Sequence, residues 1–317
     1  MKNYKCSICH SESREIGEKD NFQIIRCSVC KLEEVYNKPR GIELSDLYAN
    51  RQVRIWKDFN FKRYFKDFKE TNNNPKRDEF RFLVNNTKIR TKKNKLKILE
   101  IGCGKGPLID WANHNGHYAI GVESSEVICD FLRKKSSLDI RFIKDNDYSH
   151  LTEDSFDLIY LEHSLEHHSN LKFTLKSLRQ KLSSKGLIHV IVPNHGSKIA
   201  RKKKLKWLNY SPPHHLYFFN KENLSNAFQL NNYLILDIRE TLRFDSGVWN
   251  FYSLDRYINF VIRLINKFFN LGIRQMKYKN KYPRSIFDFI RLLPYFVYQK
   301  KVDEELLITA YKNNEFT

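Results

Sequence analysis

The sequence predicts an α/β fold built around an open parallel sheet. A glycine-rich loop separates an apolar segment from a helix, a second apolar segment ends in an acid, and apolar and amphipathic segments alternate further along the chain. With 317 residues, 41% of them hydrophobic, the chain can bury a large core. Two further parts flank this core: a cysteine-rich N-terminus and a basic stretch before the last strand.

The glycine loop lies inside a predicted βαβ unit. A strand at 97–101 precedes the loop, a helix begins at Pro107, and a second strand runs from Tyr118 to Glu123. Ligands approach the main chain at the carboxyl ends of such strands, where nucleotide cofactors bind in open sheets. Glu123 lies 21 residues after Gly102, the spacing at which a carboxylate accepts hydrogen bonds from ribose hydroxyls.

The loop Gly102-x-Gly104-x-Gly106 departs from the G-x-G-x-x-G of dinucleotide folds. Together with Glu100 it resembles the first motif of the class I S-adenosylmethionine-dependent methyltransferases, D/E-x-G-x-G-x-G. The resemblance implies a Rossmann-like sheet of seven strands, the last antiparallel, with helices on both faces and S-adenosylmethionine (SAM) as cofactor. It assigns to the cofactor Glu100, Gly102, Gly104, Gly106, Glu123, Asp145 (with Asp147 as the other candidate near the adenine) and Leu161.

The resemblance covers roughly residues 75–240 and the last ten or so. "SFDLIYLEHSLEHHSN" resembles the fourth strand and its hydrophobic-E-H segment, and "LRQKLSSKGLIHVIVPN" resembles the fifth strand, with a turn expected at Lys185-Gly186. Asn232 stands where relatives carry a glycine before the sixth strand, and asparagine tolerates the left-handed conformation. "EELLITAYKN" resembles the seventh, antiparallel strand.

Histidines and one acid are the candidate catalytic residues. His167 would orient or deprotonate the acceptor, with Glu166 supporting it. His215 matches a substrate-side loop that reads P-x-H-L-x-x-F in one branch of the family. His163, Glu166 and His167 also form H-x-x-E-H, where some relatives carry E-x-x-E-H and bind a divalent ion, so a metal there is one alternative and plain packing is another.

The N-terminus carries a second pattern, two C-x2-C pairs separated by 17 residues. This spacing is typical of a four-thiolate zinc site. A closed shell of four sulfurs leaves no open position, so the zinc is expected to be structural, with the ligands Cys6, Cys9, Cys27 and Cys30.

These patterns divide the chain into four parts. We predict a zinc module at 1–36, a helical linker or pocket cover at 37–90, the methyltransferase core at 91–241 and 302–317, and a basic amphipathic insertion at 242–301. The insertion is expected to be a lid, a segment lying on an anionic membrane or a dimer surface. Without an apparent signal peptide or a long apolar span, we expect a cytoplasmic protein, peripheral on the inner face of the membrane if the insertion contacts lipid.

The formal charge of +20 suits an anionic partner, although a lysine-rich and asparagine-rich composition also accounts for it. We expect methyl transfer to a small-molecule or glycan acceptor, a sugar or lipid-linked saccharide hydroxyl in surface-polysaccharide or related biosynthesis, in line with zinc-bearing relatives. The alternatives are a nucleic-acid methyltransferase that uses the zinc module for binding, and a cofactor-binding scaffold. "LEHSLEHH" lacks the Pro-Pro-aromatic segment of base-amine methyltransferases, which favours the first class.

Overall fold

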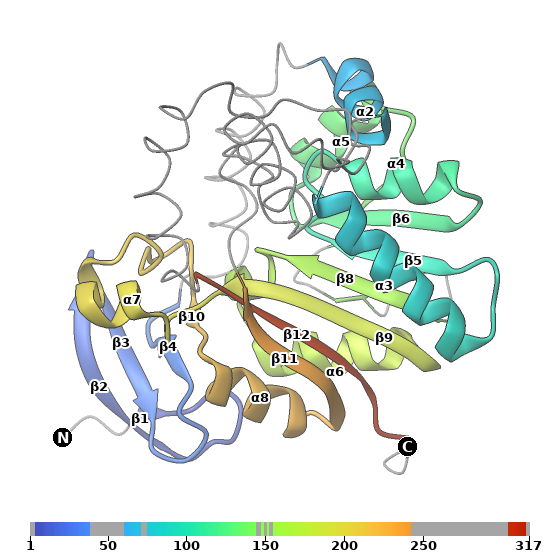
Figure 1. Ribbon diagram of the computed structural model, residues 1–317. Coiled ribbons are helices and arrows are strands. Elements are labelled where there is room, and N and C mark those ends of the chain that lie inside the picture. Colours follow the sequence, from blue (N-terminus) through green and yellow to red (C-terminus); the bar gives the residue numbers. More distant parts are fainter. Residues whose placement is uncertain are drawn as a thin grey trace, which may run out of the picture.

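The computed structural model describes residues 4–38, 60–70, 75–143, 147–148, 151, 155–241 and 304–314 (Figure 1). The predicted insertion at 242–301, parts of the linker at 39–59 and 71–74, and Asp145 lie outside the described residues. Among the helices of the described part, none is both long and apolar enough to cross a bilayer.

Seven strands form the larger sheet in the order β11-β12-β9-β8-β5-β6-β7. Strands β5 to β9 pair in parallel, and β12 pairs antiparallel with both β9 and β11, which confirms the predicted antiparallel last strand. The strands are β5 Lys97–Ile101, β6 Tyr118–Glu123, β7 Ile140–Phe142, β8 Phe156–Glu162, β9 Leu182–Pro193, β11 Tyr233–Thr241 and β12 Glu305–Lys312.

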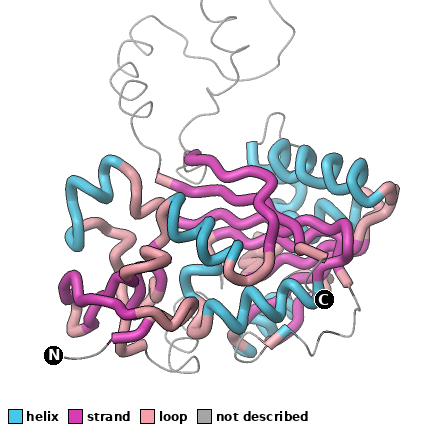
Figure 2. Tube along the Cα trace, turned by 90° about the horizontal axis from the view of Figure 1, so that it is seen from below, coloured by secondary structure: helices cyan, strands magenta, loops and turns pink. Residues whose placement is uncertain are grey.

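Helices cover both faces of this sheet, as predicted (Figures 1 and 2). Alternate residues of each strand point to opposite faces, so Ile98 and Leu158 join one apolar cluster while Leu99 and Ile159 join the other. The first cluster also holds side chains of α2 Phe61–Glu70, α3 Pro75–Thr91, α4 Pro107–His114 and α5 Glu126–Lys135, and the second holds those of α6 Leu171–Lys181 and α8 Lys221–Gln229.

The cysteine-rich N-terminus forms a second sheet, in the order β1-β2-β3-β4-β10. Its strands are β1 Tyr4–Lys5, β2 Glu12–Lys19, β3 Phe22–Cys27, β4 Glu33–Val35 and β10 Tyr217–Phe218. The fifth strand, β10, comes from the core, and its Tyr217 and Phe218 lie opposite Glu34 and Glu33 of β4. A strand of the core thus completes the N-terminal sheet (Figure 1). This pairing was not predicted from the sequence.

Local details both confirm and correct the expectations. Asn232 has a φ of 60°, the predicted left-handed conformation. Strand β9 includes Lys185 and Gly186, but its pairing with β8 passes from Leu182 directly to Leu187, so an irregularity within the strand lies where a turn was expected. Beyond β8, the H-x-x-E-H segment is no regular α-helix but a single 3-10 turn, η3 Leu165–His167. After β9 come α7 Lys198–Lys203 and the 3-10 turn η4 Lys204–Lys206.

Candidate functional site

Three glycines between β5 and α4 have left-handed backbones, and they need to be glycine for different reasons. At Gly102, with φ of 66°, an added Cβ would lie 2.8 Å from the Ser164 hydroxyl oxygen. At Gly106 it would lie 2.5 Å from Cδ1 of Leu138. At Gly104, apart from the two neighbouring residues, no atom of the described part lies within 4 Å of that position. Two glycines therefore allow close packing within the protein, and Gly104 faces the open space where a ligand can approach.

Two carboxylates lie beside this loop. Glu123, at the end of β6, accepts a hydrogen bond of 2.8 Å from the Gly104 amide, and burial raises its pKa to about 7 despite that bond. Glu100, in β5, is buried, and its Oε2 has no hydrogen-bond partner within the described residues. Burial, followed by the charge of Glu162, raises the pKa of Glu100. A buried carboxylate oxygen without a partner suits a ligand with hydrogen-bond donors, as SAM has.

The other residues considered at the cofactor site are either buried in the core or outside the described residues. Asp145 lies outside the described residues, so its place near the adenine stays a prediction. The side chain of Leu161 is fully buried in the core between β5 and β9, so it packs within the protein. Cys103, inside the glycine loop, is also buried and lies against Gly121 as a small packing residue.

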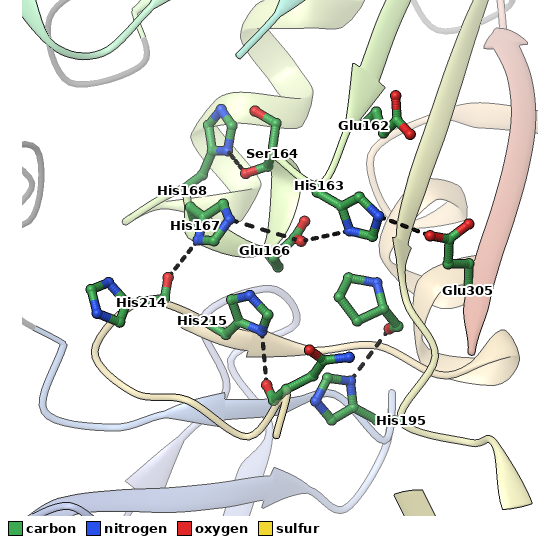
Figure 3. A network of polar contacts seen from close by, with 12 residues as sticks. Glu162, His163, Ser164, Glu166, His167, His168, His195, His214, His215 and Glu305 are labelled. Carbon is green, nitrogen blue, oxygen red and sulfur yellow. Dashed lines mark hydrogen bonds and ion pairs between the residues drawn. The ribbon is translucent and has the colours of Figure 1, made fainter. Parts of the chain in front are cut away.

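The candidate catalytic residues gather beside the loop, around Glu166 (Figure 3). The Glu166 side chain is fully buried, and neither carboxylate oxygen makes a hydrogen bond within the described residues. Its Oε1 lies 3.5 Å from Nδ1 of His163 and 3.9 Å from Nε2 of His167. The His167 and His215 rings meet edge to face, with centroids 4.9 Å apart. The predicted trio of Glu166, His167 and His215 is thus brought together.

Backbone carbonyls fix the tautomers of both histidines. His167 Nδ1 lies 2.6 Å from the carbonyl oxygen of His214, and His215 Nδ1 lies 2.7 Å from that of Asn209. A carbonyl only accepts hydrogen bonds, so each Nδ1 carries the proton. When the rings are neutral, each Nε2 is therefore the unprotonated nitrogen, which is the form that a general base or a metal ligand needs.

The charges in this cluster follow from the contacts. Burial raises the pKa of Glu166, but the ion pair with His163 and the charge of His167 outweigh it and bring the pKa to about 2. Burial lowers the pKa of His163, but Glu166 and Glu305 bring it up to about 10. His215 stays neutral at pH 7, because burial lowers its pKa to about 4. An ion pair of His163 and Glu166 therefore lies beside His167 and His215.

Glu305, the first residue of β12, was not among the residues predicted from the sequence. Its Oε1 lies 3.0 Å from Nε2 of His163, so the imidazolium of His163 is held between two carboxylates. His163 has a φ of 47°, uncommon for a residue with a side chain and often found at functional sites. By contrast, His195 is buried against Trp207 and Tyr210, and its Nε2 has no hydrogen-bond partner within the described residues.

A metal ion could bind in the same place. Three side chains each offer one ligand atom, and these atoms lie within 4.8 Å of one another: Glu166, His167 and His215. Two imidazoles and a carboxylate suit a first-row divalent ion with open coordination positions. His163, which the H-x-x-E-H motif included, is instead engaged by Glu166 and Glu305.

The four N-terminal cysteines also come together. Cys6 Sγ lies 3.5 Å from that of Cys30, Cys9 Sγ lies 3.4 Å from that of Cys27, and all four sulfurs are within 4.8 Å of one another. Sulfurs bound tetrahedrally to zinc at about 2.3 Å lie about 3.8 Å apart, so the cluster has the size that zinc requires. The backbone amides of Ile8 and Val29 each donate to a cysteine sulfur at 3.4 Å, which favours thiolates.

The comparisons with known proteins agree with this fold. A family model described as a methyltransferase domain matches residues 60–238. Among solved structures, the chain is similar to a SAM-dependent methyltransferase from Mesorhizobium loti (18% identity, 68% of this chain, 90% of that chain, TM-score 0.43) and to one from Archaeoglobus fulgidus (18%, 73%, 94%, 0.43). It is also similar to geranyl diphosphate C-methyltransferase from Streptomyces coelicolor A3(2) (12%, 75%, 79%, 0.45).

No curated protein matches the chain. The family model spans more than half of the sequence and includes the glycine loop, Glu123 and the Glu166 cluster. The chain therefore belongs to the methyltransferase-domain family, and it is a class I SAM-dependent methyltransferase.

Proposed function

We propose that this methyltransferase acts on a hydroxyl group of a sugar or lipid-linked saccharide in surface-polysaccharide or related biosynthesis. The observation that carries the proposal is the pair of histidines, His167 and His215, beside the buried carboxylate of Glu166. A hydroxyl must lose its proton when it is methylated, and this cluster offers a base for that proton.

Each residue of the cluster has a part in this scheme. SAM, when bound, supplies a methyl group activated by its sulfonium. Nε2 of His167 or His215 accepts the proton of the acceptor hydroxyl, and the ionised Glu166 stabilises the imidazolium that results. His163, held by Glu305, keeps Glu166 ionised. Ser164 lies close to Gly102, so the cluster is next to the glycine loop, and an acceptor bound there would lie near the cofactor.

A basic segment supports an acceptor that carries phosphate. Residues 198–206 follow β9 and hold six lysines and arginines, all of them exposed. The segment begins five residues beyond the end of β9, at the carboxyl edge where the histidines lie. Sugars activated for polymer synthesis are joined to a nucleotide or a lipid through phosphates, and such a group would meet these cations.

The test has two stages. Calorimetric titration with S-adenosylhomocysteine, with zinc content measured on the same sample, should give micromolar binding and about one zinc per chain. Transfer of labelled methyl from SAM should then be compared on nucleotide sugars, lipid-linked saccharides and bulk RNA. Transfer to RNA alone would overturn the saccharide proposal.

The same assay separates a histidine base from a divalent ion at Glu166, His167 and His215. A base predicts that turnover survives EDTA at a concentration that leaves the thiolate-bound zinc in place. Loss of turnover with EDTA and its recovery with magnesium or manganese would assign these three residues to a metal instead.

A further inference from the structure

The cysteine-rich sheet and the candidate catalytic cluster meet at one short segment. We call residues 4–38 the cysteine module and residues 207–219 the histidine loop, which carries His214 and His215 between η4 and α8. We propose that the cysteine module, when its four thiolates hold a metal, fixes the histidine loop in the geometry that sets His215 and His167 beside Glu166. The catalytic meaning of this inference rests on the proposed function, whereas the contacts themselves do not.

Leu216, the residue after His215, is bonded on both sides. Its carbonyl accepts a hydrogen bond of 2.9 Å from the Val35 amide of the module, and its own amide donates to the Glu166 carbonyl at 2.8 Å. The next two residues form β10, which pairs with β4. Leu216 thus connects the module to the 3-10 turn that carries Glu166 and His167. The connection runs through the backbone, so it depends on where β4 lies.

A buried side-chain contact joins the same two parts. The Tyr210 hydroxyl, in the histidine loop, donates to the carboxylate of Glu33 in β4. Both residues are buried, and Arg26 of the module balances the Glu33 charge. The Tyr210 ring also packs on Phe218, with centroids 4.5 Å apart. A buried carboxylate with a charged and a neutral partner holds the loop more firmly than exposed contacts do.

Further contacts reach the metal-binding turn itself. From α8, the side-chain amide of Asn226 donates to the Cys30 carbonyl at 3.2 Å, and that of Asn223 donates to the Lys31 carbonyl at 3.3 Å. Cys30 is one of the four expected metal ligands. The core therefore contacts the module at a ligand residue as well as at β4. A displacement of the turn that carries Cys30 would change the contacts with α8 and those with β10.

The module is too small to hold this arrangement by its own core. It spans 35 described residues, and its apolar side chains, such as Ile24, Leu32 and Val35, belong to a cluster shared with the core. Below about 40 residues a domain needs a metal, disulfides or a partner to stay folded. We therefore assign to the metal the role of ordering β4, and to Glu33 and Tyr210 the role of positioning residues for the histidine loop.

Hydrogen exchange of the full-length protein tests this inference without an acceptor. Metal-loaded protein is compared with protein stripped by a mercurial thiol reagent and a chelator, then returned to reduced thiols. Amides of the peptide covering 207–219 should exchange at least about tenfold faster after stripping, while the peptide covering β5 and α4 stays unchanged. Unchanged protection of the histidine loop in the stripped protein overturns the inference.

Tyr210→Phe supplies a second test that keeps the metal. It removes one hydroxyl, and exchange of the histidine loop should rise about fivefold with zinc content and S-adenosylhomocysteine affinity unchanged. The matched control is Tyr36→Phe, in a half-exposed tyrosine of the same module. If removal of the metal unfolds the whole chain, the comparison of the two variants tests the inference instead. Equal exchange of the histidine loop in Y210F and Y36F overturns it. Altered loop protection in a protein that methylates no acceptor would uphold it and refute only the proposed function.

Discussion

Replacement of Glu166 by glutamine removes one charge from the centre of the cluster and keeps the shape of the side chain. The carboxylate is fully buried and lies 3.5 Å from the His163 imidazole, which also contacts Glu305. The variant therefore loses a buried ion pair and leaves His163 with one carboxylate instead of two. We expect a large loss of stability, because a buried charge that loses its partner is costly.

The magnitude follows from the ionisation of Glu166. The pKa of Glu166 falls from 4.5 to about 2, and a shift of one pKa unit corresponds to about 1.4 kcal/mol. The ionised form therefore adds about 3 kcal/mol of stability above pH 4.5. This contribution is lost as the pH falls toward 2. The pKa of His163 rises from 6.5 to about 10, so its contribution is complete below pH 6.5 and is lost as the pH rises toward 10. One ion pair produces both effects and is counted once, and its contribution is largest between pH 4.5 and 6.5.

Urea unfolding of the full-length, zinc-loaded protein at pH 6 and pH 9 measures this difference. Glu166→Gln should lose about 3 kcal/mol relative to the original protein at pH 6 and clearly less at pH 9. Glu240→Gln, at an exposed position on β11, is the control and should change stability by less than about 0.5 kcal/mol. A loss of the same size at both pH values, or one as small as the control, would refute the ion-pair account.

The remaining predictions concern the cofactor loop and the histidines. Gly102→Ala should lower the free energy of unfolding in urea by about 2 kcal/mol more than Gly116→Ala. Both backbones are left-handed, but only at Gly102 would the added Cβ meet another side chain within 3 Å. Equal losses of stability would contradict the packing role of Gly102. Glu123→Ala should weaken S-adenosylhomocysteine binding at least about tenfold in calorimetry, and an unchanged affinity would remove it from the cofactor site. His167→Ala and His215→Ala should each slow methyl transfer by about 10²-fold or more with cofactor affinity within about twofold of the original; full turnover in both would exclude them as bases.

The part of the site around the glycine loop could be predicted because its signals are local. A strand, three glycines, a helix that begins at Pro107 and an acid at residue 123 all lie within 27 consecutive residues, from Lys97 to Glu123. The predicted bounds of β5 and β6 agree with the structure. Even the left-handed backbone at Asn232 could be foreseen, because it depends on a single residue type at a helix end.

The contacts between segments far apart in the sequence could not be predicted in the same way. Strand β10 has two residues, too few for a periodic pattern, and it pairs with a strand about 180 residues earlier in the chain. Glu305 reaches His163 across 142 positions of the sequence, and a single acid at the start of a strand carries no signal of its partner. Both contacts depend on the final arrangement of the sheets, which local propensity does not determine.

The position of Leu216 gives a physical reason why three distant motifs occur in one chain. Its carbonyl is bound by the cysteine module and its amide by the turn that carries Glu166, so the histidine beside it cannot shift without breaking a hydrogen bond on one side or the other. The Leu216 side chain is itself fully buried, so its truncation would leave a cavity beside these two backbone bonds. A change that displaces β4 or η3 should therefore also shift His215, because both elements are bonded to the backbone of the residue that follows it.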